Sequence, residues 1–166
     1  MIDKVGIEKN LRQIDRLYAR SSSAQEGLLF SKLAILELCG WIENSMDNIV
    51  LNTARQLIRQ PKHLEYFKKE VVGKVYGFEY EKHFRRMVIA LIGLHGVETM
   101  EKNVHLHVFD PMCASLNALK PNRDTLAHGY IEGATTHLDA PSVILGRFRT
   151  VYAGLVDIER VLKTIK

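Results

Sequence analysis

Lys120-Pro-Asn-Arg-Asp-Thr-Leu-Ala-His-Gly-Tyr130 is the most informative stretch of the chain. Pro121 fits the first turn of a helix, where its missing N–H costs no hydrogen bond. Gly129 fits the left-handed position that commonly follows a helix end. The segment between them therefore predicts a short helix with a polar face and a defined end.

The spacing of three polar residues in this segment bears on function. Asp124 and His128 are four positions apart and are neighbours on one helical face. Arg123 and His128 are five apart, which separates them by about 140° on an ideal helix. The two can meet on one ligand through the long arginine side chain, a distorted last turn or a second copy of the helix. This separation favours a site assembled at an interface.

The chemistry of these residues suits RNA cleavage. A histidine in the last helical turn lies near the negative end of the helix dipole, which favours its protonated form. Asp124 can hold one ring nitrogen of His128 and leave the other free for proton transfer. Arg123 offers a planar set of donors for a phosphate that gains charge. The same Asp–His spacing also describes an ordinary stabilised helix end, and that structural interpretation stays open.

The sequence from Arg123 to Tyr130 resembles the Arg-x(4–6)-His signature of the HEPN superfamily, and occurs once in the chain. Its His-Gly-Tyr ending is similar to the Arg-x4-His-x-Tyr form of HEPN toxins that are paired with nucleotidyltransferase antitoxins. The resemblance implies a dimeric α-helical bundle and a metal-independent ribonuclease without a cofactor, in defence, toxin–antitoxin or RNA-processing systems. It also implies Tyr130 as a residue that the antitoxin adenylylates; a tyrosine packed beside the helix end is the alternative. Some HEPN proteins are non-catalytic binding modules.

Length and composition agree with a compact protein. The 166 residues predict one domain, 1–166, with a sizeable core. Alternating acidic and basic residues near the start do not fit a signal peptide, and the apolar run Met87–Leu94 is too short to span a bilayer. Cys39 and Cys113 are expected to be reduced thiols. We therefore expect a cytoplasmic protein without a membrane segment.

The charge is mildly basic and unevenly distributed. The net charge is +4, and the segment from Arg55 to Arg86 holds nine Lys or Arg against four Asp or Glu. Such a segment can attract phosphate backbones, or it can be a solvated basic face. No aromatic pattern of the RRM type accompanies it, so we expect RNA contacts to be mainly electrostatic.

Apolar periodicity predicts helices over residues 3–20 and 24–60, with an N-cap from Ser21–Ser23 and a stop at Pro61. The expected apolar stripe of the second helix consists of Leu29, Leu33, Leu36, Cys39, Met46, Val50 and Leu57, widened by Ile35, Ile42 and Ile49.

Glu43 falls inside this stripe and needs a partner, because a buried carboxylate is costly unless it is paired. We predict Arg123 as that partner, which makes Glu43 a supporting residue of the site. A purely structural ion pair is the alternative. Asp47, one turn further along, has the same ambiguity.

The remaining pattern predicts a helix over 63–75, a helix over 79–94 closed by Gly93 and Gly96, and an extended connector at 104–108. A further helix is expected to start at Asp110-Pro111, and the last at Asp139-Ala-Pro141. The first of these meets the helix at Pro121, and the two either join as one kinked helix or lie end to end. Together, these predicted helices form an all-α bundle of about five or six helices.

The predicted protein is a homodimeric HEPN-type endoribonuclease with Arg123, Asp124 and His128 as catalytic residues. The first alternative is a non-catalytic HEPN-like dimer that binds a partner protein or a nucleotide. The second is a metal-dependent hydrolase that uses His105 and His107. That pair forms half a metal site without a third ligand nearby, so we expect no metal.

Overall fold

The computed structural model describes residues 2–129 and 137–165, with the side chain of His128 left out. The described residues form six α-helices and no strand: α1 (Val5–Tyr18), α2 (Ala24–Leu57), α3 (Pro61–Glu70), α4 (Arg85–Asn103), α5 (Leu106–His128) and α6 (Pro141–Leu162). The predicted all-α class is therefore confirmed.

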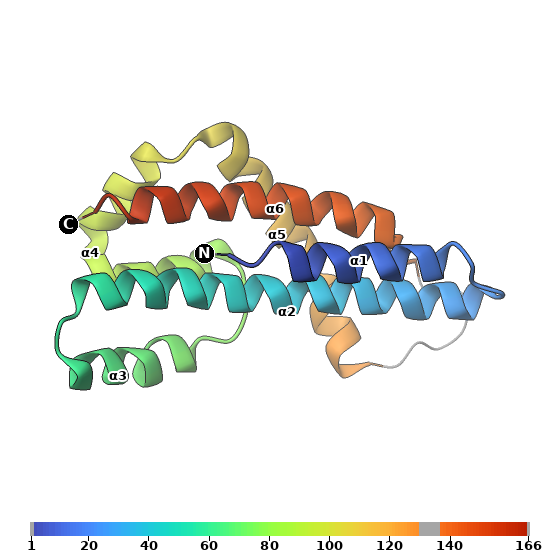
Figure 1. Cartoon of the computed structure of the whole chain (residues 1–166), viewed down its shortest axis with the longest axis horizontal. Helices are drawn as coiled ribbons and strands as arrows, with labels where there is room; N and C mark the ends of the chain where they lie inside the picture. The colour runs from blue at the N-terminus through green and yellow to red at the C-terminus, as the bar shows by residue number, and fades with distance from the viewer. Residues whose placement is uncertain (1, 130–136, 166) are drawn as a thin grey trace.

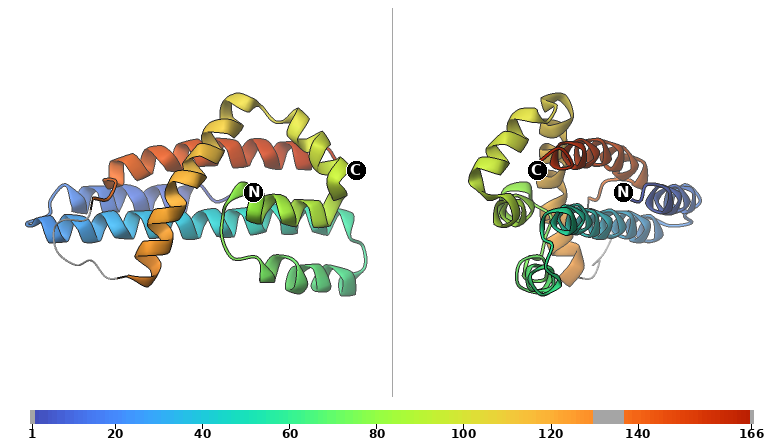
Figure 2. Two further views of the ribbon diagram at one scale, coloured as in Figure 1. Left: turned by 180° about the vertical axis from the view of Figure 1, so that it is seen from behind. Right: turned by 60° about the vertical axis from the view of Figure 1, so that its left-hand side comes forward.

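Three helices, α1, α2 and α6, lie side by side and pack on one another (Figure 1). Helix α5 crosses them obliquely and packs on both α6 and α2 (Figure 2). The interior is apolar, and its largest fully buried side chains include Phe84, Phe148, Leu11, Ile35, Leu38, Ile42, Met46, Met87, Met100, Met112 and Leu116. None of the helices in the described part of the chain is long and apolar enough to cross a membrane.

Helix α2 begins at Ala24 as predicted and ends at Leu57, three residues before the predicted end. The Oγ of Ser23 accepts a hydrogen bond from the backbone N–H of Glu26 at 3.2 Å, and the helix ends before Pro61. The first part of the predicted apolar stripe is wrong, because Leu29 and Leu33 are 52% and 44% exposed. Helices α1, α5 and α6 pack on α2 elsewhere, and none of the described helices covers these two leucines.

The middle of the chain differs from the prediction. The backbone leaves helical geometry at Gly93, with φ of 71°, where the helix was predicted to close, but a helical segment resumes after it and α4 continues as far as Asn103. Resuming the helix buries Val97 and Met100. The expected extended connector at 104–108 is also wrong, because α5 already begins at Leu106.

Helix α5 is one helix rather than two. The predicted start at Pro111 is wrong, and of the two arrangements left open at Pro121 the structure has one continuous helix, since each proline lies inside it. An interior proline costs about 3 kcal/mol. Each buried apolar side chain contributes about 1.5 to 3 kcal/mol, and the buried side chains of α5 are Met112, Leu116, Leu119 and Leu126. Burial of these four side chains, about 6 to 12 kcal/mol in all, therefore at least offsets the cost of about 6 kcal/mol for the two prolines.

Helix α6 begins at Pro141, as predicted, and its buried face includes Ile144, Phe148, Val151, Leu155, Ile158 and Leu162. Cys39 and Cys113 form no disulfide.

Candidate active site

Arg123 lies on the last turns of α5, where this helix crosses α2. Its Nη2 donates to Oε1 of Glu43 at 2.8 Å, so the predicted ion pair between the two residues is present. The arginine side chain is 29% exposed. A guanidinium has five N–H donors, and Glu43 and Asp124 take only part of them. Arg123 is thus fixed in place and still able to bind an anion.

Asp124 is ionised and held by two cations. Lys120 Nζ donates to its Oδ2 at 2.6 Å, and Arg123 Nη1 donates to its Oδ1 at 3.2 Å. These hydrogen bonds lower the pKa of Asp124 below its usual value, and the bond from Lys120 has the larger effect. The predicted contact between Asp124 and His128 stays a prediction, because the side chain of His128 lies outside the described part of the structure.

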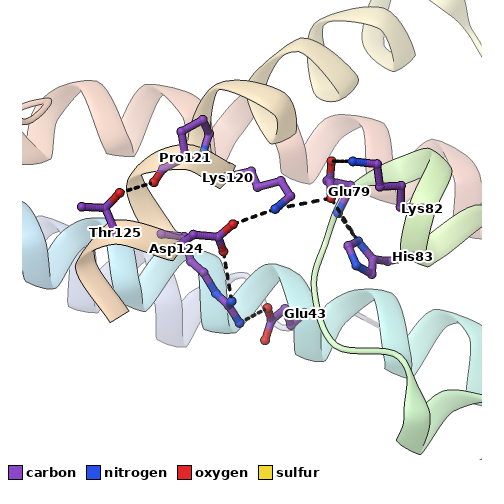
Figure 3. A network of polar contacts seen from close by, with 9 residues as sticks. Glu43, Glu79, Lys82, His83, Lys120, Pro121, Asp124 and Thr125 are labelled. Carbon is purple, nitrogen blue, oxygen red and sulfur yellow. Dashed lines mark hydrogen bonds and ion pairs between the residues drawn. The ribbon is translucent and has the colours of Figure 1, made fainter. Parts of the chain in front are cut away.

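Glu79 extends the same network to the segment before α4 (Figure 3). Its Oε2 lies 3.6 Å from Nζ of Lys120 and 3.7 Å from Nδ1 of His83, and its Oε1 lies 3.2 Å from Nζ of Lys82. Although Oε2 is buried without a hydrogen bond, the ion pairs of Glu79 with Lys120 and Lys82 compensate its charge. A chain of polar contacts therefore runs from Glu43 through Arg123 to Glu79.

His83 anchors the segment that carries Glu79. The backbone N–H of Glu79 donates to Nδ1 of His83 at 3.1 Å, which places the proton of a neutral ring on Nε2. Burial lowers the pKa of His83 below its usual value, aided by the charge of Lys120 and opposed by Glu79. The ring is therefore expected to be neutral at pH 7 and to act as a donor rather than as a base.

Gly77 is required beside this ring for two reasons. Its φ of 129° lies in the region that favours glycine. A Cβ at this position would lie 2.7 Å from Cε1 of His83. The residues that follow form a π-helical turn, Tyr80–Phe84, of the kind that often occurs at functional sites. The hydroxyl of Tyr80 donates to Glu101 at 2.8 Å, which fixes the turn on α4.

The network lines a cavity of about 290 Å³ between this segment and α5. Its lining includes Lys82, His83, Lys120 and Arg123 as cationic or titratable groups, and Glu79 and Asp124 as acids. Arginine and lysine side chains with some free donors can bind the oxygens of a phosphodiester. The cavity can therefore accept an anionic group next to Arg123.

Asp47 lies one turn beyond Glu43 on α2. Partial burial, together with the negative charge of Glu43, raises the pKa of Asp47 to about 6. No other side chain in the described parts of the chain forms a hydrogen bond or ion pair with it. The carboxyl group is therefore in an environment that disfavours its charge.

The end of α5 differs from the predicted termination. Gly129 has an extended backbone, with φ of −107°, and not the left-handed conformation. Glycine is needed there because a Cβ would lie 2.8 Å from the carbonyl oxygen of Thr125. The Gly129 carbonyl accepts a hydrogen bond from Lys32 Nζ at 2.7 Å, which ties the helix end to α2. Tyr130 lies outside the described residues.

His105 and His107, the residues of the alternative metal site, have ring centroids 5.6 Å apart. Nδ1 of His105 lies 2.8 Å from Oδ1 of Asp157. Among the described residues, no group of three or more His, Cys, Asp or Glu side chains is arranged to hold a metal ion.

Sequence reasoning missed the contribution of Glu79, Lys82, His83 and Lys120. The spacing of four between Glu79 and His83, and between Lys120 and Asp124, indicates pairs within one helix. The two pairs come together only because α5 crosses the bundle next to the segment that carries Glu79, and spacing along the sequence does not show this.

Comparisons with models of known protein families, with curated proteins and with solved structures find no match to this chain. The functional argument therefore depends on the residues and geometry of the site.

Proposed function

We propose that this protein is a metal-independent endoribonuclease of the HEPN type, active as a homodimer. The observation that carries the proposal is the state of Arg123: it lines a cavity, Glu43 holds it, and some of its donors are unused. His128 follows five residues later on the same helix. This combination of a phosphate-binding arginine and a proton-transferring histidine is what RNA cleavage needs.

The proposed reaction needs only the RNA substrate and side chains of the protein. The ribose 2′-oxygen attacks the adjacent phosphorus and loses its proton, while the bond from phosphorus to the 5′-oxygen breaks and that oxygen gains a proton. His128 carries these protons, and Arg123 stabilises the charge on the phosphoryl oxygens. Asp124 orients His128 or shapes the helix end. The products are a 2′,3′-cyclic phosphate and a 5′-hydroxyl.

An exposed apolar surface supports the dimer. Leu29 and Leu33 lie on the open face of α2. The side chain of Lys32, between them in sequence, reaches the end of α5 at Gly129. A second copy of the chain placed over this surface would bury both leucines and bring a second α5 end close to the first. Such an arrangement would bring Arg123 of one copy near His128 of the other, which is one of the ways in which two residues five apart on a helix can meet on one ligand.

The resemblance also supports a regulated toxin or defence protein of the cytoplasm. Its partner would be a nucleotidyltransferase antitoxin or another component of a defence system, and Tyr130 would accept the adenylyl group. Co-expression with a neighbouring nucleotidyltransferase, followed by mass spectrometry, tests this part: an unmodified Tyr130 contradicts it.

The first experiment compares wild type, His128→Ala and His63→Ala on a mixed RNA pool in the presence of EDTA. His63 is exposed on α3 and serves as the matched control. We expect cleavage with cyclic-phosphate ends by wild type and His63→Ala, and none by His128→Ala. Cleavage by pure His128→Ala would contradict the assigned site. Inactivity of all three would favour the alternative, a non-catalytic module that binds a partner protein or a nucleotide.

A mixing experiment tests the shared site. Arg123→Gln and His128→Ala are each expected to be inactive alone. If each site combines Arg123 of one copy with His128 of the other, co-refolding the two variants restores one intact site in each mixed dimer. Absence of any restored cleavage in verified mixed dimers would overturn the shared site.

A further inference from the structure

A second cavity adjoins the one at Arg123. It has a volume of about 870 Å³ and lies between the end of α3 and the start of α4. Tyr76, Lys82 and His83 line both cavities. The two cavities therefore adjoin at Tyr76, Lys82 and His83, and together they are called the groove below; it extends from the end of α3 past Tyr76 to Arg123.

Tyr76 is the most exposed large hydrophobic side chain among the described residues, at 81% exposure. It lies in the segment between the 3₁₀ turn Val72–Lys74 and the π-helical turn Tyr80–Phe84. Its position where the two cavities meet leaves the ring free to contact a ligand. An exposed aromatic ring beside cationic side chains is typical of surfaces on which single-stranded bases stack.

Arg86 supplies a cation to the same groove. It is exposed in the first turn of α4, lines the larger cavity and forms no ion pair with any described residue. Lys82 is also exposed, although its ammonium group pairs with Glu79. Other cations of the lining, such as Lys74, are likewise paired. Arg86 is thus the cation of the groove most available to a phosphate.

We propose that this groove binds single-stranded RNA on one side of the scissile phosphate. One base stacks on Tyr76, a backbone phosphate contacts Arg86, and the strand passes Lys82 to reach Arg123. This inference deepens the proposed ribonuclease function and rests on it. A duplex is a poor fit, because its bases are already stacked and their faces are closed to a side chain. Stacking on Tyr76 adds to the electrostatic contacts that the sequence predicts.

The test measures fluorescence anisotropy of a labelled single-stranded RNA of about 12 nucleotides. The RNA carries 2′-O-methyl groups so that it cannot be cleaved. Tyr76→Ala should weaken binding about tenfold, whereas Tyr76→Phe should bind like wild type because it keeps the ring. Arg86→Gln should weaken binding severalfold and make it less dependent on salt. An unlabelled duplex of the same sequence should compete poorly.

Matched controls are available on the same part of the chain. Tyr66 is 66% exposed on α3 and lines neither cavity, and Arg59 is exposed and lines neither. Tyr66→Ala and Arg59→Gln should bind like wild type. Three results would each overturn the proposal that this groove binds single-stranded RNA. Tyr76→Ala could bind as tightly as wild type, Tyr66→Ala could lose as much affinity as Tyr76→Ala, or the duplex could compete as well as the single strand.

The binding test separates this inference from the proposed function. If wild type cleaves RNA while Tyr76→Ala binds and cleaves as well as wild type, the groove is wrong and the nuclease stands. If binding depends on Tyr76 while wild type cleaves no RNA, the nuclease proposal fails and the groove stands as an RNA-binding surface.

Discussion

Helix α5 carries a polar network at each end, and the two differ in how completely their groups are used. At its start, Asp157 of α6 accepts hydrogen bonds from the backbone N–H of His105 at 2.6 Å and from Arg160 at 2.8 Å. The side chain of Asp157 is only 10% exposed. Near the other end of α5, Arg123 lines a cavity and keeps unused donors.

Both networks combine a carboxylate, an arginine and a histidine, so residue types alone do not distinguish a structural cluster from a candidate site. Both oxygens of Asp157 have partners: Oδ2 binds His105 N–H, and Oδ1 contacts the His105 ring and Arg160. This network, in which the carboxylate is buried and fully paired, holds the start of α5 against α6. The open network at Arg123 has a cavity beside it, and this opening supports a functional role.

The largest expected difference between the two networks appears when the arginine of each is replaced by glutamine. Arg123→Gln should lower the rate of RNA cleavage by about 100-fold or more, because it removes a donor to the developing charge. Arg160→Gln should lower the free energy of unfolding and leave the rate unchanged. Single-turnover cleavage and thermal unfolding of both variants measure the two effects. If Arg160→Gln lowered the cleavage rate and Arg123→Gln lowered only the stability, the roles assigned to the two networks would be reversed.

The next effect concerns how the contribution of Asp157 to the stability of the fold depends on pH. Burial alone would raise its pKa, but the hydrogen bonds from His105 and Arg160 outweigh burial and lower it to about 2. The ionised carboxylate therefore stabilises the fold above its unfolded pKa of about 4, by about 2 kcal/mol, and this contribution is lost as the pH falls towards 2.

Asp157→Asn should therefore lower the free energy of unfolding by about 2 kcal/mol at pH 7 and by roughly half as much at pH 3. Urea unfolding of the variant and wild type at both pH values gives the two differences. An equal loss at both would show that the charge of Asp157 is not what stabilises the fold.

The smallest effect has the opposite sign and belongs to Asp47. Its pKa is raised to about 6, so its charged form is disfavoured in the folded protein. The resulting penalty is small below about pH 4, grows up to pH 6 and stays constant above it. Asp47→Asn should raise the free energy of unfolding by about 1 kcal/mol at pH 8 after allowance for solvent screening.

The same variant should change stability little at pH 4, which provides an internal control. Thermal unfolding at the two pH values is sufficient. A loss of stability at pH 8 would mean that Asp47 has a favourable partner and that its environment resembles that of Asp157.

Much of the candidate site can be found by reading the sequence, but only as separate parts. The Arg123–His128 spacing and the inward projection of Glu43 on α2 are visible as patterns, and they led to the predicted ion pair between Glu43 and Arg123. Tyr76 gave no signal, because one tyrosine in a mixed segment has no periodicity. Leu29 and Leu33 gave a misleading signal, since a helical stripe does not show whether another helix covers it.

The sequence by itself determined the all-α class and the starts of α2 and α6, and it located α1 and the end of α2 to within a few residues. Apolar periodicity, a serine cap and helix-starting or helix-stopping prolines act over such short distances. The tertiary structure decided that α5 runs through both of its prolines and that α4 resumes after Gly93. It also brought Glu79 and His83 to Lys120 and Arg123. These outcomes depend on burial and on charges far apart in the chain, which local spacing does not encode.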